Sequence, residues 1–513
     1  MIPKRVGRLS LRLTLSLVFA GLVLRADVRL PGLFSDHMVL QQGLTVPVWG
    51  WADAGETVTV TFRGKSVTAT PQDGKWVMRL PKQKAGGPFE LVVEGRNRIE
   101  LRDVLVGEVW ICSGQSNMEW PLSAAFEPQA VIDASANPSL RLFTVPKLKT
   151  ESPVDDVKAS WQECNPQTVK SFSAVGYFFG RDLQKARGVP VGLIHTSWGG
   201  SPAEVWMRQE VLAANPDYKR AILDPYPEQA RKFQEELAKW EKETEELKKA
   251  GKTQTRGRPW SNWRPSELYN GMIAPLLPFA LRGAIWYQGE SNADRAFQYR
   301  TLFPNMIQNW RDDWGQGDFT FLAVQLAPWD KGRQRAPELI TAKPEDSNWA
   351  ELREAQSLTA KTLPKVGLAV ITDLGDKDDI HPPKKEPVGA RLALAARAIA
   401  YGEKLISSGP TFKSMKIKKD QAILSFDHTG SGLEARGGRL RGFALCGEDG
   451  HFVWANATLN GNKVVVSTPI VSKPVAVRYG WADYPVVNLF NREGLPASPF
   501  RTDDFPMLTG PKE

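Results

Sequence analysis

Residues 109–122 read VWICSGQSNMEWPL and change abruptly from an apolar run to small polar residues. Val109–Ser113 has the pattern of a buried strand, and the residues after Gly114 are typical of a turn that opens a helix. Such a turn displays Ser116 where backbone N–H groups of the first helical turn favour negative charge. The stretch predicts either a simple helix cap or a nucleophilic serine, depending on whether the chain supplies a base, an orienting acid and oxyanion donors.

Alternating strand and helix patterns continue along the chain and predict an α/β fold with a mostly parallel sheet. Further strands are expected at Val189–Thr196, Gly283–Gln288, Phe319–Gln325 and Val366–Thr372, and helices at Ala174–Arg187, Arg300–Trp314 and Val388–Ala400. In such sheets the ligand binds beyond the carboxyl ends of the strands. Polar clusters that follow strand ends are therefore the candidates for a site.

β-rich segments flank this α/β region and divide the chain. Short strands separated by turns in residues 27–104 predict an N-terminal β-sandwich domain. The α/β domain spans residues 105–404, and residues 405–513 form a β-rich C-terminal module with a hairpin signal at Asn460-Gly461. A helical insertion covers about residues 215–262, and its charged helix with one apolar stripe is expected to pack over the domain rather than form a coiled-coil dimer.

Residues 1–26 predict a signal peptide. A basic segment precedes the 12-residue apolar run Leu13–Leu24, which is short for a membrane span, and Ala26 offers a small residue for cleavage. We therefore expect a secreted or periplasmic protein without stable membrane insertion after cleavage.

The charge and cysteine counts exclude several protein classes. Residues 1–26 hold five basic and no acidic residues, so the remaining chain has 61 basic and 57 acidic residues and a net charge of +4 instead of +9. That balance predicts no nucleic-acid partner. Three cysteines are too few for a disulfide-built scaffold, their spacing predicts no metal site, and no dinucleotide fingerprint appears, so no cofactor is expected.

Two polar clusters follow predicted strands and offer oxyanion donors. In Ser197-Trp198-Gly199-Gly200-Ser201, the paired glycines let backbone N–H groups approach a ligand without interference from Cβ atoms. In Gln288-Gly289-Glu290-Ser291-Asn292, the Gln288 amide is a candidate donor. Glu290 either fixes the site by hydrogen bonding or serves as the acid partner of a histidine.

A histidine near the last predicted strand is the candidate base. Among the five histidines, only His381 has acids two and three residues before it, Asp379 and Asp378, at a strand end and ahead of a helix. An acid on the same loop can hold the imidazole tautomer and leave the other nitrogen free to take a serine proton. Together the four segments predict a serine hydrolase site at the carboxyl edge of the sheet.

Several motifs occur in an order that resembles the SGNH-hydrolase superfamily, and more narrowly the sialate O-acetylesterase-like family. They are FSDHMVLQQ from Phe34, GQSNMEWP around Ser116, SWGGSPAEVW from Ser197, PSELYNGMIAPL from Pro265, WYQGESNA from Trp286 and DIHPPKKEPVGARLA from Asp379. The resemblance implies a flavodoxin-like three-layer α/β/α domain with flanking β modules, which removes acetyl groups from sugars without a metal or other cofactor.

The resemblance also implies roles for individual residues. Ser116 matches the nucleophile and His381 the base, while the N–H groups of Ser116 and of Gly199 or Gly200 and the Gln288 amide match the oxyanion hole. The acid stays open, because the superfamily spacing selects Asp378, the Asp-Ile-His form selects Asp379, and Glu290 is a third candidate. Residues expected to bind substrate or support the site are Gln115, Asn117, Trp198, Glu290, Asn292 and Arg391.

The substrate expected from the resemblance is 9-O-acetylated sialic acid, with acetylated xylan or another acetylated polysaccharide as the alternative. Trp120, Trp198 and Trp206 are candidates for a sugar-stacking surface, and Arg391 or Lys384 for binding a sialate carboxylate. A catalytically idle carbohydrate-binding protein is the alternative from another class, and the Ser116–His381 pair argues against it. A lipase or thioesterase would require an apolar groove. The sequence indicates no oligomeric state.

Overall fold

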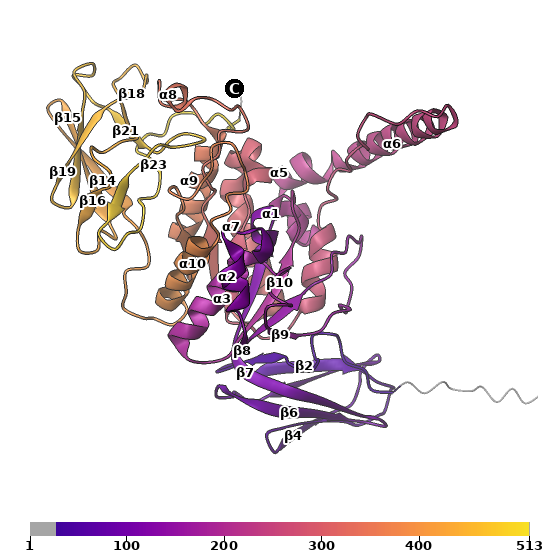
Figure 1. The fold of residues 1–513 in the computed structure, drawn as a ribbon. Coiled ribbons are helices and arrows are strands. Elements are labelled where there is room, and N and C mark those ends of the chain that lie inside the picture. Colours follow the sequence, from indigo (N-terminus) through magenta and orange to yellow (C-terminus); the bar gives the residue numbers. More distant parts are fainter. Residues whose placement is uncertain (1–26, 512–513) are drawn as a thin grey trace, which may run out of the picture.

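The computed structural model describes residues 27–511, which form a central α/β body with β-rich regions at two ends (Figure 1). The predicted signal peptide, residues 1–26, lies outside the described residues. All three cysteines, Cys112, Cys164 and Cys446, are buried and unbridged. The mixed α/β class predicted from the alternating pattern is confirmed.

The body is built on one sheet with the strand order β13-β12-β11-β7-β10-β8-β9. Its neighbours are paired in parallel except for β9, which runs antiparallel to β8 at the edge. The strands are β7 (Arg98–Gly114), β8 (Asn137–Thr144), β9 (Gln162–Cys164), β10 (Val191–Ser197), β11 (Gly283–Tyr287), β12 (Thr320–Val324) and β13 (Val366–Ala369). The five predicted strands are all present, whereas β8 and β9 were not expected.

Helices cover both faces of this sheet. On one face α3 (Ala174–Arg187) packs against α10 (Glu386–Ile399), and Trp110 of β7 meets Phe179 of α3 with ring centroids 5.0 Å apart. On the other face lie α7 (Ala296–Trp314) and α9 (Asn348–Thr362), and Trp286 of β11 meets Trp310 of α7 at 5.8 Å. Shorter helices are α1 (Ser116–Glu119), α2 (Pro128–Asp133), α4 (Gln209–Ala214), α5 (Pro216–Tyr218) and α8 (Pro337–Ile340).

Strand β7 belongs to two sheets. Its first residues pair antiparallel with β6 (Gly86–Glu94), and residues further along it pair in parallel with β1 (Val39–Gln41). From residue 104 onward every residue of β7 is buried, as expected for a strand covered on both faces. The strand therefore runs without a break across the predicted domain boundary between residues 104 and 105.

Besides β1 and β6, four short strands lie in the N-terminal region, where the sequence predicts short strands separated by turns. They are β2 (Val46–Trp51), β3 (Val58–Phe62), β4 (Lys65–Ala69) and β5 (Lys75–Leu80). β2 pairs with β5, whereas β3 pairs with β4 and β6.

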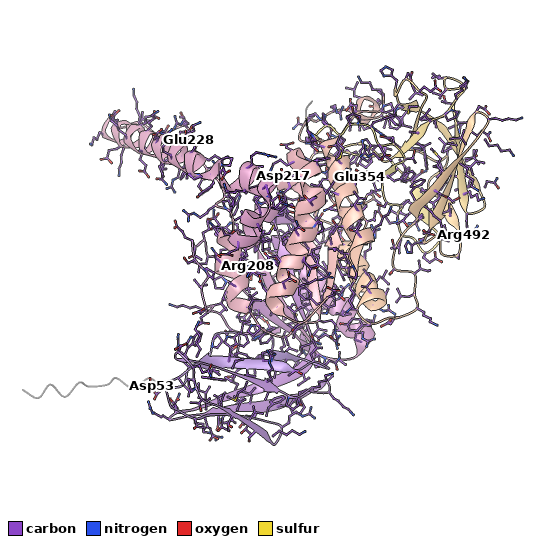
Figure 2. The ribbon with its side chains drawn as sticks, turned by 180° about the vertical axis from the view of Figure 1, so that it is seen from behind. Asp53, Arg208, Asp217, Glu228, Glu354 and Arg492 are labelled. Atoms are coloured by element: carbon purple, nitrogen blue, oxygen red, sulfur yellow. The ribbon has the colours of Figure 1, made fainter. Side chains whose placement is uncertain are left out.

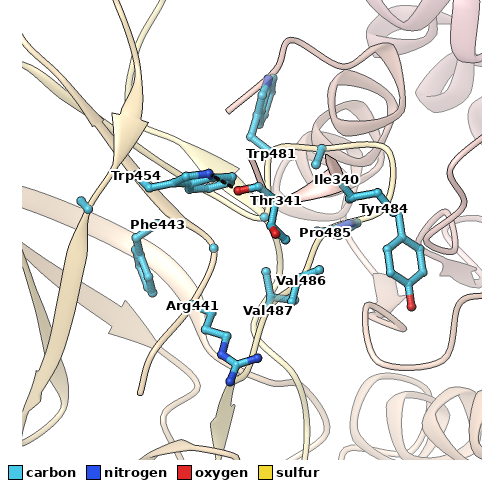
Figure 3. A pocket seen from close by; sticks show the side chains of 14 residues that line it. Ile340, Thr341, Arg441, Phe443, Trp454, Trp481, Tyr484, Pro485, Val486 and Val487 are labelled. Carbon is cyan, nitrogen blue, oxygen red and sulfur yellow. Dashed lines mark hydrogen bonds between the residues drawn. The ribbon is translucent and has the colours of Figure 1, made fainter. Parts of the chain in front are cut away.

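The C-terminal module is all β and has a core of its own. Its strands are β14 (Thr411–Lys418), β15 (Gln421–Asp427), β16 (Leu433–Ala435), β17 (Phe443–Cys446), β18 (Val453–Trp454), β19 (Asn456–Asn460), β20 (Lys463–Ser467), β21 (Ala476–Tyr479), β22 (Leu489–Asn491) and β23 (Phe500–Arg501). The hairpin predicted at Asn460-Gly461 joins β19 to β20. A pocket of about 370 Å³ lies where this module meets the segment around α8, and there Trp454 donates a hydrogen bond to the carbonyl of Thr341 (2.7 Å; Figure 3).

The helical insertion departs from the prediction. Its helix α6 (Tyr226–Lys249) has no buried residue and projects away from the body, so the expectation that it packs over the domain is wrong (Figures 1 and 2). Its apolar stripe is partly covered by the returning chain instead, where the Trp240 indole donates to the carbonyl of Arg256 (2.8 Å). Neither α6 nor any other helix within residues 27–511 is long and apolar enough to cross a bilayer.

Candidate active site

Four loops that follow parallel strands meet at one cleft of about 600 Å³. Ser116 comes after β7, Gly199 after β10, Glu290 after β11 and His381 after β13, and all four line the cleft. Because the carboxyl ends of parallel strands share one edge of the sheet, segments far apart in sequence are brought together there.

Ser116 and His381 are within hydrogen-bonding distance, with 2.9 Å between Oγ and Nε2. The turn before Ser116 requires Gly114, whose φ is +139°, because a Cβ atom there would lie 2.2 Å from the carbonyl oxygen of Tyr287 in β11. Trp120 stacks on the imidazole with centroids 5.1 Å apart, so this ring holds His381 instead of forming a free sugar platform.

Among the three candidate acids, only Asp379 approaches the imidazole. Its Oδ1 lies 3.8 Å from His381 Nδ1 and accepts the His381 backbone N–H at 2.8 Å. At 3.8 Å the contact between Asp379 Oδ1 and His381 Nδ1 is too long for a hydrogen bond. Asp378 pairs with Lys377 (2.6 Å), and Glu290 accepts a hydrogen bond from Asn117 (2.7 Å).

The environment of His381 favours a neutral imidazole. Burial is the main influence and lowers the pKa of His381 below its ordinary 6.5; the Lys385 charge lowers it further, whereas Asp379 raises it. A neutral imidazole at pH 7 can accept the Ser116 proton, which is the requirement for a general base.

The side chains that flank Ser116 tie its turn to the neighbouring loops. Gln115 Oε1 accepts the N–H groups of Gly289 (3.3 Å) and Ser291 (3.4 Å). Asn117 donates to Glu290 and to the carbonyl of Ile380 (3.0 Å), next to the base. Both residues, predicted to bind substrate or support the site, thus connect the Ser116 turn to the loops after β11 and β13.

Lys385 is a buried residue of the site that the sequence analysis did not single out. Its ammonium donates to Asn117 Oδ1, and burial lowers the pKa of Lys385 to about 7. Burial likewise raises the pKa of Glu290, whose Oε2 has no hydrogen-bond partner among the described residues. Lys385 stands within the motif after His381, but a lysine in a polar run gives no sequence signal of burial.

Gly199 lies directly against the nucleophile, because a Cβ atom at Gly199 would be 3.2 Å from the Cβ of Ser116. Its N–H is donated to Glu119 Oε2 at 2.6 Å, and the other oxygen of Glu119 accepts from Lys147 (2.6 Å). Gly200 lines the same cleft with φ +75° and open space on its Cβ side. The two glycines therefore differ, since only the Gly199 N–H already has an acceptor here.

Gln288 and Asn292 are buried behind the cleft and do not line it. Gln288 donates to Asn292 Oδ1 (2.6 Å) and to the carbonyl of Ser201 (3.3 Å), and it accepts from the hydroxyl of Tyr299 (2.8 Å). Asn292 Oδ1 also accepts the N–H of Ala203 (2.9 Å). Both Nε2 hydrogens of Gln288 are thus used inside the protein, and they hold the loop after β10.

Three other predicted residues stand apart from the cleft lining. The Trp198 ring packs edge-on against Trp263, with centroids 5.7 Å apart. Trp206 is fully buried, which corrects its prediction as a sugar platform. Arg391 forms an ion pair with Asp373 (2.6 Å) and donates to a backbone carbonyl, so this structure does not bring it to the site.

Other cleft residues were missed because they lie outside every motif. They are Trp260, Asp294, Trp329, Lys331 and Trp349. Trp260 belongs to the chain returning from α6, and Trp349 is the second residue of α9. Only their place in the fold brings them beside Ser116.

Comparison with known proteins supplies the family. The model of a family described as "Carbohydrate esterase, sialic acid-specific acetylesterase" matches residues 106–244 and 249–398, more than half of the chain. The chain belongs to this family. It is therefore a carboxylic ester hydrolase that acts on O-acetylated carbohydrates.

Similar proteins match over nearly the whole chain. Sialate O-acetylesterase from Mus musculus is 32% identical over 89% of this chain and 90% of its own, and that from Homo sapiens is 29% identical over 92% of each. The crystal structure of a carbohydrate acetylesterase from Xanthomonas citri is 40% identical, with a TM-score of 0.80 over 93% of this chain and all of its own.

Proposed function

We propose that this esterase uses Ser116, His381 and Asp379 as a catalytic triad to remove O-acetyl groups from carbohydrates. The single observation that carries the proposal is the 2.9 Å contact between Ser116 Oγ and His381 Nε2 inside the cleft. Asp379 is preferred to Asp378 and Glu290 because it alone of the three approaches the imidazole.

The reaction proceeds in two acyl transfers. His381 Nε2 takes the Ser116 proton as Oγ attacks the acetyl carbonyl carbon, and the tetrahedral intermediate collapses by breaking the bond to the sugar oxygen, which receives the proton from His381. Water then attacks the acetyl carbon of the acetyl-enzyme as His381 takes a proton from it; the bond between this carbon and Ser116 Oγ breaks, acetate leaves, and His381 returns the proton to Oγ. The Asp379 charge stabilises the imidazolium formed in both steps.

Backbone N–H groups of Ser116 and Gly200 are the proposed oxyanion donors. Ser116 is the first residue of α1, so its N–H has no acceptor within the helix. The Gly199 N–H is donated to Glu119, which favours Gly200 as the second donor. Each donor contributes about 3 kcal/mol to transition-state stabilisation. The Gln288 amide can donate to the oxyanion only if its hydrogen bond to Asn292 or to Ser201 breaks.

We also propose the finer architecture expected from the sequence. Helices on both faces of the parallel sheet support an SGNH-type three-layer domain over residues 105–404, between an N-terminal β-sandwich at 27–104 and a β-rich module at 405–513. Export is proposed from the signal-like residues 1–26.

Two substrate classes are proposed. The mammalian relatives named above favour 9-O-acetylated sialic acid. The charge of the cleft favours an uncharged acetylated oligosaccharide, because Glu290 and Asp294 are among its lining residues and its cation, Lys331, is hydrogen-bonded to Asn348 and 3.5 Å from Asp483. A sialate carboxylate would have to compete with Asp483 for Lys331.

The deciding experiment measures acetate release by the protein and by Ser116→Ala. Both are incubated with 9-O-acetylated sialic acid and with acetylated xylo-oligosaccharides. Release that disappears in the variant supports the proposal, and the faster substrate identifies the class. Release that is undiminished in Ser116→Ala, or absent from the wild type with both substrates, would overturn it.

A further inference from the structure

One aromatic residue of the cleft differs from the others in exposure. Trp260 is 75% exposed, whereas Trp349 is buried and donates its indole N–H to the carbonyl of Ala327 (2.8 Å). Trp329 packs on Trp349 with centroids 5.3 Å apart. Trp260 has no hydrogen bond or ring contact with any residue in the described range 27–511.

The chain around Trp260 is fixed on both sides. Towards α6, Lys252 donates its backbone N–H to Leu247 (2.8 Å), and the Trp240 indole donates to Arg256. On the other side, Trp263 packs against Trp198, and the ammonium of Lys149 lies 3.8 Å from the centre of the Trp263 ring. We call residues 251–263 the return arm, and Trp260 sits between its two anchors.

An exposed indole at the rim of a reactive cleft is suited to a ligand. A large aromatic ring left in water is unfavourable unless something covers it, and a ring on an anchored segment loses little conformational freedom on binding. The cleft is also lined by polar residues, among them Ser291 and Asp294. An exposed aromatic ring beside polar side chains matches a sugar, whose C–H face packs on the ring while its hydroxyl groups form hydrogen bonds.

We propose that Trp260 stacks a sugar ring of the acetylated oligosaccharide that this esterase hydrolyses. The helical insertion then acts as the support that brings this ring to the cleft, which gives a role to a helix that has no buried residue. The inference rests on the proposed function, because it assumes that the acetylated sugar lies at Ser116.

The test separates sugar recognition from ester cleavage. For the wild type, Trp260→Ala and Trp260→Phe, kcat/KM is measured with an acetylated xylo-oligosaccharide and with p-nitrophenyl acetate, which has no sugar. We expect the ratio of the two values to fall at least tenfold in Trp260→Ala and to stay within about threefold of wild type in Trp260→Phe. The control Trp454→Ala removes another partly exposed tryptophan, which does not line the cleft, and keeps the ratio within twofold.

Binding is measured separately on an inactive background. Ser116→Ala and Ser116→Ala/Trp260→Ala are titrated calorimetrically with the same oligosaccharide, and a Kd at least tenfold weaker in the double variant supports the inference. An equal Kd, no binding by Ser116→Ala, or an unchanged ratio in Trp260→Ala would overturn it. Acetate release that depends on Ser116 would still support the proposed function in that event.

Discussion

The carboxyl edge of the central sheet and the return arm border the same cleft, but they are held in different ways. Ser116 and its neighbours are cross-linked by Gln115 and Asn117 to the loops after β11 and β13 and rest on buried strands. The return arm, which carries Trp260, is held by a few contacts of its other residues to an exposed helix and to Trp198. Acyl transfer requires atoms fixed to within about 0.5 Å, whereas stacking of a ring tolerates more movement.

The largest effect should come from the base on the sheet side. His381→Ala removes the acceptor of the Ser116 proton, and we expect kcat to fall about 10⁴-fold or more with both sugar esters and p-nitrophenyl acetate. Trp260→Ala, on the arm side, should affect the sugar ester selectively. A similar loss on both substrates in the two variants would contradict the division of roles between the two sides.

Substituting alanine for one glycine in each region should lower the free energy of unfolding by different amounts. Gly114→Ala places a methyl group 2.2 Å from the Tyr287 carbonyl oxygen, and we expect the free energy of unfolding to fall by about 3 kcal/mol or more. Gly251→Ala, at the tip of the insertion, meets no atom within 4 Å and carries only the cost of a positive φ, about 1 kcal/mol. Urea unfolding of both variants checks the difference, and equal losses would contradict it.

The adjacent acids should differ in their effect on pH dependence. Activity requires neutral His381, so kcat/KM rises with pH through the His381 pKa, and this limb should lie below pH 6.5. Asp379→Asn removes the charge that raises this pKa, so we expect the limb to move to lower pH and kcat to fall about tenfold.

Asp378→Asn is the matched control, because Asp378 pairs with Lys377. The pH–rate profile of this variant should follow that of the wild type. A shift of the acid limb in Asp378→Asn without one in Asp379→Asn would reverse the assignment of the orienting acid.

The smallest effect is expected on the outer surface of the insertion. Glu235 pairs with Arg231 on α6, where both side chains are more than half exposed. Solvent screening makes such pairs weak, so Glu235→Ala should change the Tm by about 1 °C or less. A large fall in Tm would mean that α6 is coupled to the body more tightly than its exposure indicates.

The sequence predicted the parts of the site that follow the carboxyl ends of parallel strands. Ser116, Gly199 and His381 follow strand ends, and strand ends can be recognised from apolar runs that stop at polar residues. The place of Trp260 depends on the path of the return arm, which no local pattern encodes. The prediction that α6 packs over the domain was wrong. An apolar stripe indicates that another segment covers the helix, but it does not say which segment, and here the returning chain covers it in part.

The choice between the acids was also beyond the sequence. Asp378 and Asp379 are neighbours in the chain, and their difference arises from the turn that directs one carboxylate toward Lys377 and the other toward His381. Similarly, Gln288 lies within a motif, but its amide N–H groups are donated to Asn292 and to the carbonyl of Ser201. Hydrogen-bond partners of a buried amide are set by tertiary contacts.

The unbroken course of β7 has a consequence for how the molecule unfolds. Because β7 is shared by the N-terminal sheet and the central sheet, unfolding of the N-terminal sheet removes the pairing of about half of the strand that ends two residues before the nucleophile. The two regions should therefore melt in a single cooperative step and resist separation by truncation at residue 104.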